Sequence, residues 1–144
     1  MKRPATQPVG LHLARVSKVV SRAFDDALAE AGGSRPMWLV LVSVKSGQWA
    51  NQKELARSLG IEGATLTHHL DGMERAGLIK RSRDPSNRRV QRVELTKDGD
   101  AMFHRLRTAA VAFDTRLRQG LDDADARRLG RLLDRLQANV ELGS

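Results

Sequence analysis

The sequence predicts a mainly α-helical protein with one small β-hairpin, and two observations carry this prediction. In residues 51–96, two short helical patterns separated by Gly60 are followed by two strand-like runs that flank a basic loop. On either side of this stretch, apolar residues recur at helical spacing over longer segments. Helix, turn, helix and hairpin in this order form a winged helix-turn-helix. We therefore expect that unit, with further N- and C-terminal helices that serve for dimerisation.

The chain is expected to begin with an arm and a first helix. Residues 1–10 hold two prolines and few apolar side chains, which predicts a flexible arm. A helix is expected from Leu11 to about Ala31, because apolar side chains recur there at helical spacing, and Gly32 and Gly33 would end it.

A second helix is predicted against an alternative. Residues 37–44 are almost wholly apolar, so periodicity alone fits either a buried strand or a buried helix. Their β-branched side chains favour a strand. Ser34 as a cap and Pro36 in the first turn favour a helix. We predict a helix, followed by a turn at 46–49.

The helix-turn-helix is predicted to begin at Asn51, whose side chain would form a capping pair with Glu54. After Gly60, a second helix would run from about Glu62 to Ala76 and end at Gly77 in a left-handed cap. Residues spaced by four and three turn one face of this helix inward, namely Leu66, Leu70 and Met73.

The outward face of this second helix carries short or planar polar side chains, among them Thr65, Thr67 and His68. Hydroxyl and imidazole groups suit a helix that lies in a DNA major groove, where they read base edges and phosphates. For a lone helix, an ordinary polar face is the more frequent explanation, and the downstream sequence reverses that preference. His69 is expected either to pack beside Met73 or to contact a phosphate.

The hairpin concentrates positive charge. Alternating runs at 78–82 and 90–95 predict strands, and Asp, Pro, Ser and Asn in 83–89 favour a turn. Between residues 80 and 92, six basic residues stand against one acid. Arginines at a hairpin tip can enter a minor groove, and those along its strands can meet phosphates. The predicted contacts are Arg88 and Arg89 in the minor groove, and Arg81 and Arg83 on the DNA backbone.

Three motifs are specific enough to carry a resemblance: Gly77-Leu78-Ile79, Asp84-Pro85-Ser86-Asn87-Arg88-Arg89, and Leu95-Thr96-Lys97-Asp98-Gly99. They are similar to the end of the recognition helix, the wing and the segment after the wing in the MarR family of bacterial repressors. The resemblance implies a homodimeric repressor that binds a pseudo-palindromic operator and is released by a small aromatic or phenolic anion. Asn87 stands where the family commonly has an acid, so a hydrogen bond would replace an ion pair that fixes the wing arginines.

The resemblance also implies an effector pocket between the dimerisation helices and the DNA-binding lobe. By placement, we expect this pocket to involve His12, Arg15, Val16, Trp38 and Val42. Arg15 would be the partner of a carboxylate, and Trp38 a stacking wall. The alternative is that Trp38 and Val42 are plain core residues.

The C-terminal part predicts two more helices and a dimer. Thr96 would cap a helix from Lys97 to about Gln119, and Asp122 with Asp125 would start a last one. The apolar stripes of these helices and of the first helix exceed what one subunit can cover, which predicts an intertwined homodimer; a monomeric helical bundle is the alternative. The expected division is a DNA-binding region at 34–96 and a helical dimerisation region at 11–33 and 97–144.

Composition narrows the function. The net charge of +8 favours a polyanionic partner such as double-stranded DNA. The chain has no cysteine, which excludes disulfides, cysteine-based zinc sites and thiol sensing. No apolar run approaches membrane-spanning length, so we expect a cytoplasmic protein.

Catalytic and metal chemistry find no support in the sequence. No nucleophile elbow, phosphate-cradling glycine loop or paired-carboxylate cleft can be assembled, so we expect neither an enzyme nor a cofactor. His68 and His69 diverge on one helix, and His12 and His104 lie in different helices, so no metal site is predicted. The rivals are an architectural or constitutive DNA-binding protein without effector, and an enzyme or protein-interaction module with the same fold.

Overall fold

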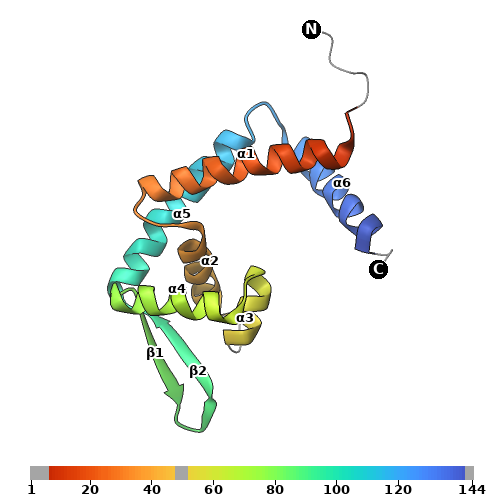
Figure 1. Cartoon of the computed structure of the whole chain (residues 1–144). Coiled ribbons are helices and arrows are strands. Elements are labelled where there is room, and N and C mark those ends of the chain that lie inside the picture. The colour runs from red at the N-terminus through yellow and green to blue at the C-terminus, as the bar shows by residue number, and fades with distance from the viewer. Residues whose placement is uncertain (1–6, 48–51, 142–144) are drawn as a thin grey trace. The chain divides into compact units, whose positions relative to one another are not determined.

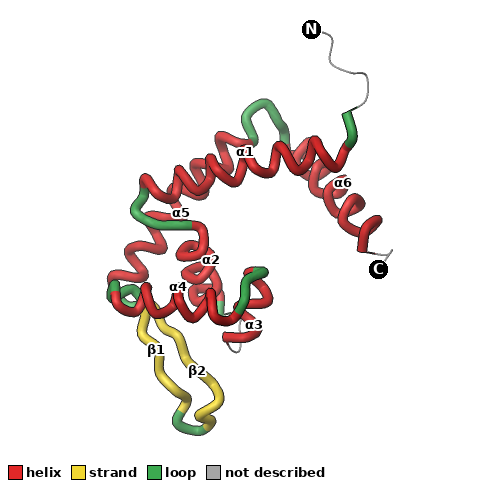
Figure 2. Tube along the Cα trace, in the orientation of Figure 1, coloured by secondary structure: helices red, strands yellow, loops and turns green. Residues whose placement is uncertain are grey.

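The computed structural model describes residues 7–47 and 52–141, and within them it confirms the predicted fold class (Figure 1). Most of the described residues are helical, and the sheet that they form is one antiparallel two-stranded hairpin (Figure 2). The elements in order are α1 (Val9–Glu30), α2 (Arg35–Ser46), α3 (Gln52–Leu59), α4 (Gly63–Arg75), β1 (Ile79–Asp84), β2 (Asn87–Leu95), α5 (Lys97–Leu117) and α6 (Asp123–Glu141). The chain divides into two compact units, residues 1–110 and 111–144.

The second helix begins where its local signals place it, whereas the first begins earlier than predicted. α1 starts at Val9, two residues inside the predicted arm, with Pro8 at its N-cap position. At α2, the Ser34 hydroxyl accepts a hydrogen bond from the Met37 amide at 3.3 Å, and Pro36 lies in the first turn. The prediction of a helix at 37–44 is therefore confirmed, and the strand alternative is wrong because the cap and the proline outweigh β-branching.

The helix-turn-helix consists of α3 and α4. Gly60 and Gly77 end them in the left-handed region at φ +67° and +76°, where glycine avoids the steric cost that other residues incur. The inward face of α4 is the predicted one, since Leu66, Leu70 and Met73 are all buried. The predicted capping residue Asn51 lies outside the described residues.

The hairpin is longer than predicted. Its strands reach Asp84 and Asn87, so the expected loop at 83–89 shrinks to Pro85 and Ser86. The cause is local: the Asp84 carboxylate accepts hydrogen bonds from the Ser86 amide at 2.9 Å and from its hydroxyl at 2.7 Å, which closes a tight Asx-type turn. A register shift after Arg83 takes up the remaining residues of β2.

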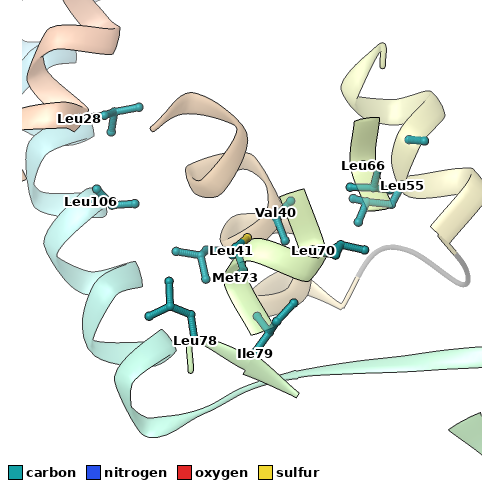
Figure 3. Packing of buried hydrophobic residues seen from close by; sticks show 11 residues of the cluster. Leu28, Val40, Leu41, Leu55, Leu66, Leu70, Met73, Leu78, Ile79 and Leu106 are labelled. Atoms are coloured by element: carbon teal, nitrogen blue, oxygen red, sulfur yellow. The ribbon is translucent and has the colours of Figure 1, made fainter. Parts of the chain in front are cut away.

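One hydrophobic core joins α1, the helix-turn-helix, the root of the hairpin and α5 (Figure 3). Its fully buried side chains come from almost every element of the unit 1–110, and they are Leu28, Val40, Leu41, Leu55, Leu66, Leu70, Ile79 and Leu106. Because α2, α4 and Ile79 share this core, α4 and the hairpin root are packed against each other.

A tight junction joins the hairpin to α5. The Thr96 hydroxyl donates to the Gly77 carbonyl and accepts from the Gly99 amide at 3.0 Å, so one side chain caps α5 and holds the turn after α4. A Cβ on Gly99 would lie 1.9 Å from the Leu78 carbonyl oxygen. The Leu-Thr-x-x-Gly motif is thus the packing contact that places α5 against the base of the hairpin.

The unit 111–144 contains the end of α5 and all of α6. The predicted start of the last helix is confirmed by reciprocal bonds: the Asp125 amide donates to the Asp122 carboxylate at 2.7 Å, and the Asp122 amide donates to the Asp125 carboxylate at 3.1 Å. α6 buries none of its described residues. In the part of the chain that the structure describes, no helix is long and apolar enough to cross a bilayer.

Candidate nucleic-acid interface

The outward face of α4 presents part of the predicted reading surface. Thr65 and His68 are exposed, whereas Thr67 and His69 are half-buried. Ala64 is exposed beside Thr65. The surface available to a DNA groove therefore centres on Thr65 and His68, which lie about one helical turn apart.

Thr67 already uses its hydroxyl within the protein. That hydroxyl donates to the Gly63 carbonyl at 3.0 Å and accepts a hydrogen bond from the Gln52 side-chain amide at 2.5 Å. Since a hydroxyl carries a single donor, Thr67 has no further proton to offer a base edge. The Gln52 contact ties α3 to the first turn of α4.

The two adjacent histidines border one shallow hollow. Their ring centroids lie 6.0 Å apart with the planes tilted by 58°. The hollow measures about 200 Å³, and it is lined by Ser34, Met37, His68, His69, Gly72, Met73 and Arg75. His69 thus lies beside Met73, as one of its two predicted positions required.

Arg81 is held by two carboxylates of α4. Its guanidinium donates to Asp71 and, at 3.1 Å, to Glu74, while its backbone amide donates to the other Glu74 oxygen at 3.1 Å. The Arg81 side chain is only 15% exposed. The side-chain hydrogen bond from Arg81 is the main reason why the pKa of Glu74 is lowered, so this carboxylate is charged at neutral pH.

The tip of the hairpin is organised by Asp84. Hydrogen bonds from Ser86, and then the charge of Arg92 at 3.5 Å, lower the pKa of Asp84. Arg83 is exposed on β1 and pairs in register with Gln91. Arg88 and Arg89 follow Asn87 in the irregular part of β2, and their side chains lie outside the described residues.

The DNA contacts predicted from the sequence did not include two basic residues of α3. Lys53 and Arg57 are both exposed, and they border a hollow of about 440 Å³ beside Gln52, Gly63 and Thr67. Their spacing of four residues places them on one helix face, and this was the signal in the sequence. They add exposed positive charge beside the start of α4.

The predicted effector residues are divided between two helices. His12, Arg15 and Val16 are exposed on α1, and Trp38 and Val42 are half-buried on α2. The Trp38 ring stacks on Phe103 of α5, with centroids 5.7 Å apart, and it packs against the core.

A larger cavity lies elsewhere in the same unit. It measures about 540 Å³, and its lining residues are Asp25, Ala29, Gly33, Ser34, Arg35, Pro36, Leu39, Leu59 and Ile61. At its edge, the Arg35 guanidinium donates two hydrogen bonds to the Asp25 carboxylate, at 2.9 and 2.8 Å. None of the predicted effector residues lines this cavity.

Comparison with known proteins points to one family. A model of the MarR family matches residues 34–90. The crystal structure of the transcriptional regulator PA3341 is similar over 93% of this chain and 98% of that chain, with 31% sequence identity and a TM-score of 0.78.

The repressor CouR is similar in two structures. Bound to a 23-mer DNA duplex, it is 28% identical, with a TM-score of 0.80 over 90% of this chain and 92% of that one. CouR from Rhodococcus jostii, bound to p-coumaroyl-CoA, is 25% identical, with a TM-score of 0.77 over 95% and 94%.

Proposed function

Because this chain belongs to the MarR family of transcriptional regulators, we propose that it is a homodimeric repressor that binds a pseudo-palindromic operator. The observation that carries the proposal is the placement of α4 beside a basic hairpin on one packed core. A helix with exposed Thr65 and His68 fits a major groove, and the hairpin arginines fit the flanking backbone and minor groove.

The basic residues divide between the two ways in which a protein holds DNA. Lys53, Arg57 and Arg83 are exposed side chains that would contact phosphates and fix the orientation of the domain. Arg88 and Arg89, on the irregular segment next to the hairpin tip, would enter the minor groove. Base reading then falls to Thr65 and His68, with the hydroxyl oxygen of Thr67 as an acceptor only.

A second copy of the chain is the partner that the exposed apolar side chains require. On α1 these are Val9, Leu11, Leu13, Val16 and Val19, and in the unit 111–144 they are Val111, Leu117, Leu121, Leu129, Leu132, Leu133 and Val140. Apolar surface of this extent marks an interface. A two-fold dimer would place two copies of α4 about one helical turn of DNA apart.

For the effector we propose a small aromatic or phenolic anion, or a thioester of one, since the similar repressor CouR binds p-coumaroyl-CoA. Two sites remain for it: the predicted set around Arg15 and Trp38, and the cavity next to Arg35. Both candidate sites include residues of α1, so a bound ligand would change the spacing of the two copies of α4, which we call the recognition helices. The ligand would release DNA only if it bound better to a dimer whose two copies of α4 do not match the spacing of the half-sites.

DNA binding tests the function directly. The purified chain is titrated against a duplex from its own upstream region and against a mixed-sequence duplex of equal length. We expect symmetric protection of two half-sites about one helical turn apart, and a solution mass twice the 15.9 kDa of the chain. Equal affinity for both duplexes at every salt concentration would favour an architectural protein, and no binding to either would contradict the proposal.

Two cavity variants separate the effector sites. Ala29→Trp would fill the cavity next to Arg35. Trp38→Ala would remove the stacking ring from the predicted set around Arg15 and Trp38. A panel of phenolic acids and acyl-thioesters is scored by release of DNA. Loss of release in one variant with full DNA affinity assigns the site, and a wild-type protein that no compound releases would contradict the effector proposal.

A further inference from the structure

We propose that Arg81 is a positioning residue that fixes the angle between the hairpin and the recognition helix, and that it does not itself bind a phosphate. The inference rests on the proposed DNA-binding function. It concerns the three-residue cluster Arg81, Asp71 and Glu74, which we call the wing brace.

The wing brace adds polar contacts between α4 and β1, which also share the buried core around Met73 and Ile79. Glu74 lies in the last turn of α4, and one of its oxygens accepts the Arg81 backbone amide while the other accepts the Arg81 guanidinium. Asp71, one turn earlier, accepts a further guanidinium bond. A backbone bond and a side-chain bond to one carboxylate fix both the position and the direction of β1.

Arg81 is more buried than the neighbouring basic residues of β1. Its side chain is 15% exposed, whereas Lys80 and Arg83 on either side of it are exposed. A phosphate contact would require the guanidinium to leave two carboxylates, and charge-assisted bonds of this kind are among the stronger ones in proteins. Both side-chain bonds come from Nη2 of the guanidinium, whose two N–H groups serve the two carboxylates.

The wing brace also neutralises two acidic side chains of the recognition helix. Asp71 and Glu74 are acids on the recognition helix, where they would repel phosphates. Arg81 is the cation that pairs with both of them. Removing an acid near DNA normally strengthens binding. Whether a substitution of Glu74 strengthens or weakens DNA binding therefore distinguishes the two roles of Arg81.

The experiment uses Glu74→Gln, which removes an acid and no cation. If Arg81 is a brace, this variant binds the upstream duplex several-fold more weakly, and its salt dependence becomes shallower because the hairpin loses phosphate contacts. Arg81→Ala and Arg81→Lys should both weaken binding by about tenfold, since alanine has no donor and the lysine ammonium ends one bond short of the place that Nη2 occupies between the two carboxylates. The double variant Glu74→Gln/Arg81→Ala should bind no worse than Arg81→Ala alone.

Lys80→Ala is the matched control, since it removes one exposed cation from the same strand. As a phosphate contact, Lys80 of each subunit would contribute about 0.9 to the slope of log affinity against log salt, so Lys80→Ala would lower the slope of the dimer by about 1.8. Tighter binding by Glu74→Gln, or near-normal binding by Arg81→Lys, would identify Arg81 as a phosphate contact and overturn the proposal.

A measurement without DNA keeps the brace separate from the proposed function. Hydrogen exchange of the amides in 79–84 should be faster in Glu74→Gln and Arg81→Ala, and unchanged in Lys80→Ala, with the α-helical circular dichroism retained in all three. Unchanged exchange in Glu74→Gln would overturn the brace. A wild-type protein that binds no duplex would contradict the function alone.

Discussion

Gly99→Ala tests whether the junction between the hairpin root and α5 holds the domain together. The Cβ of alanine would lie 1.9 Å from the Leu78 carbonyl oxygen and 2.9 Å from its carbon. Both atoms belong to the backbone, so no side-chain rotation relieves the overlap. The backbone of Leu78 or the start of α5 must therefore move.

Two opposed effects set the expected change in the free energy of unfolding. Alanine favours a helix over glycine by about 1 kcal/mol, whereas overpacking of a tight contact costs about 1–3 kcal/mol and occasionally more. A backbone overlap belongs at the upper end of that range, so we expect a net loss of about 2 kcal/mol in the free energy of unfolding. With a urea m-value of about 2 kcal/mol/M, the midpoint would fall by about 1 M.

The assay is urea unfolding followed by circular dichroism at one fixed protein concentration, because the stability of a dimer depends on concentration. Gly72→Ala is the matched control, since Gly72 is also helical and a Cβ there meets nothing within 4 Å. This control should gain up to about 1 kcal/mol. If Gly99→Ala is as stable as the parent protein, the close approach of α5 to Leu78 is refuted.

Three further outcomes are expected. Replacing Arg88 and Arg89 with Ala should lower the slope of log DNA affinity against log salt by about 1.8 per subunit, or about 3.6 for the dimer; an unchanged affinity in a salt series would remove the minor-groove assignment. The pKa of Glu74 is lowered below its ordinary 4.5 by the Arg81 bond, so its stabilising contribution is complete above about pH 4.5 and is lost as the pH falls through the lower folded value. The difference in urea midpoint between the parent and Glu74→Gln should therefore stay constant from neutral pH to about pH 5 and shrink in more acidic buffer; growth of that difference on acidification would contradict the pairing. Leu133→Asp, at a side chain that is 41% exposed in one protomer, should convert the dimer to a monomer in light scattering and abolish cooperative operator binding; a dimer of unchanged affinity would place the interface elsewhere.

Most of the helices and strands could be predicted from the sequence, because the signals that start and end them are local. The cap at Ser34, the reciprocal pair Asp122 and Asp125, and the left-handed glycines at 60 and 77 act within a few residues of the helices that they end. The inward face of α4 followed from spacing alone. Family motifs at the wing and after it then indicated the class of function.

Which polar side chains keep unused hydrogen-bond donors depends on tertiary contacts. Arg81 and Arg83 occupy equivalent positions of the alternating strand pattern, yet the direction in which β1 leaves the turn at Gly77 brings Arg81, but not Arg83, to the carboxylates of Asp71 and Glu74. Likewise, Thr67 meets Gln52 of α3 only because the two helices pack together. A side chain's free donors depend on neighbours that are distant in the sequence, and periodicity carries no information about them.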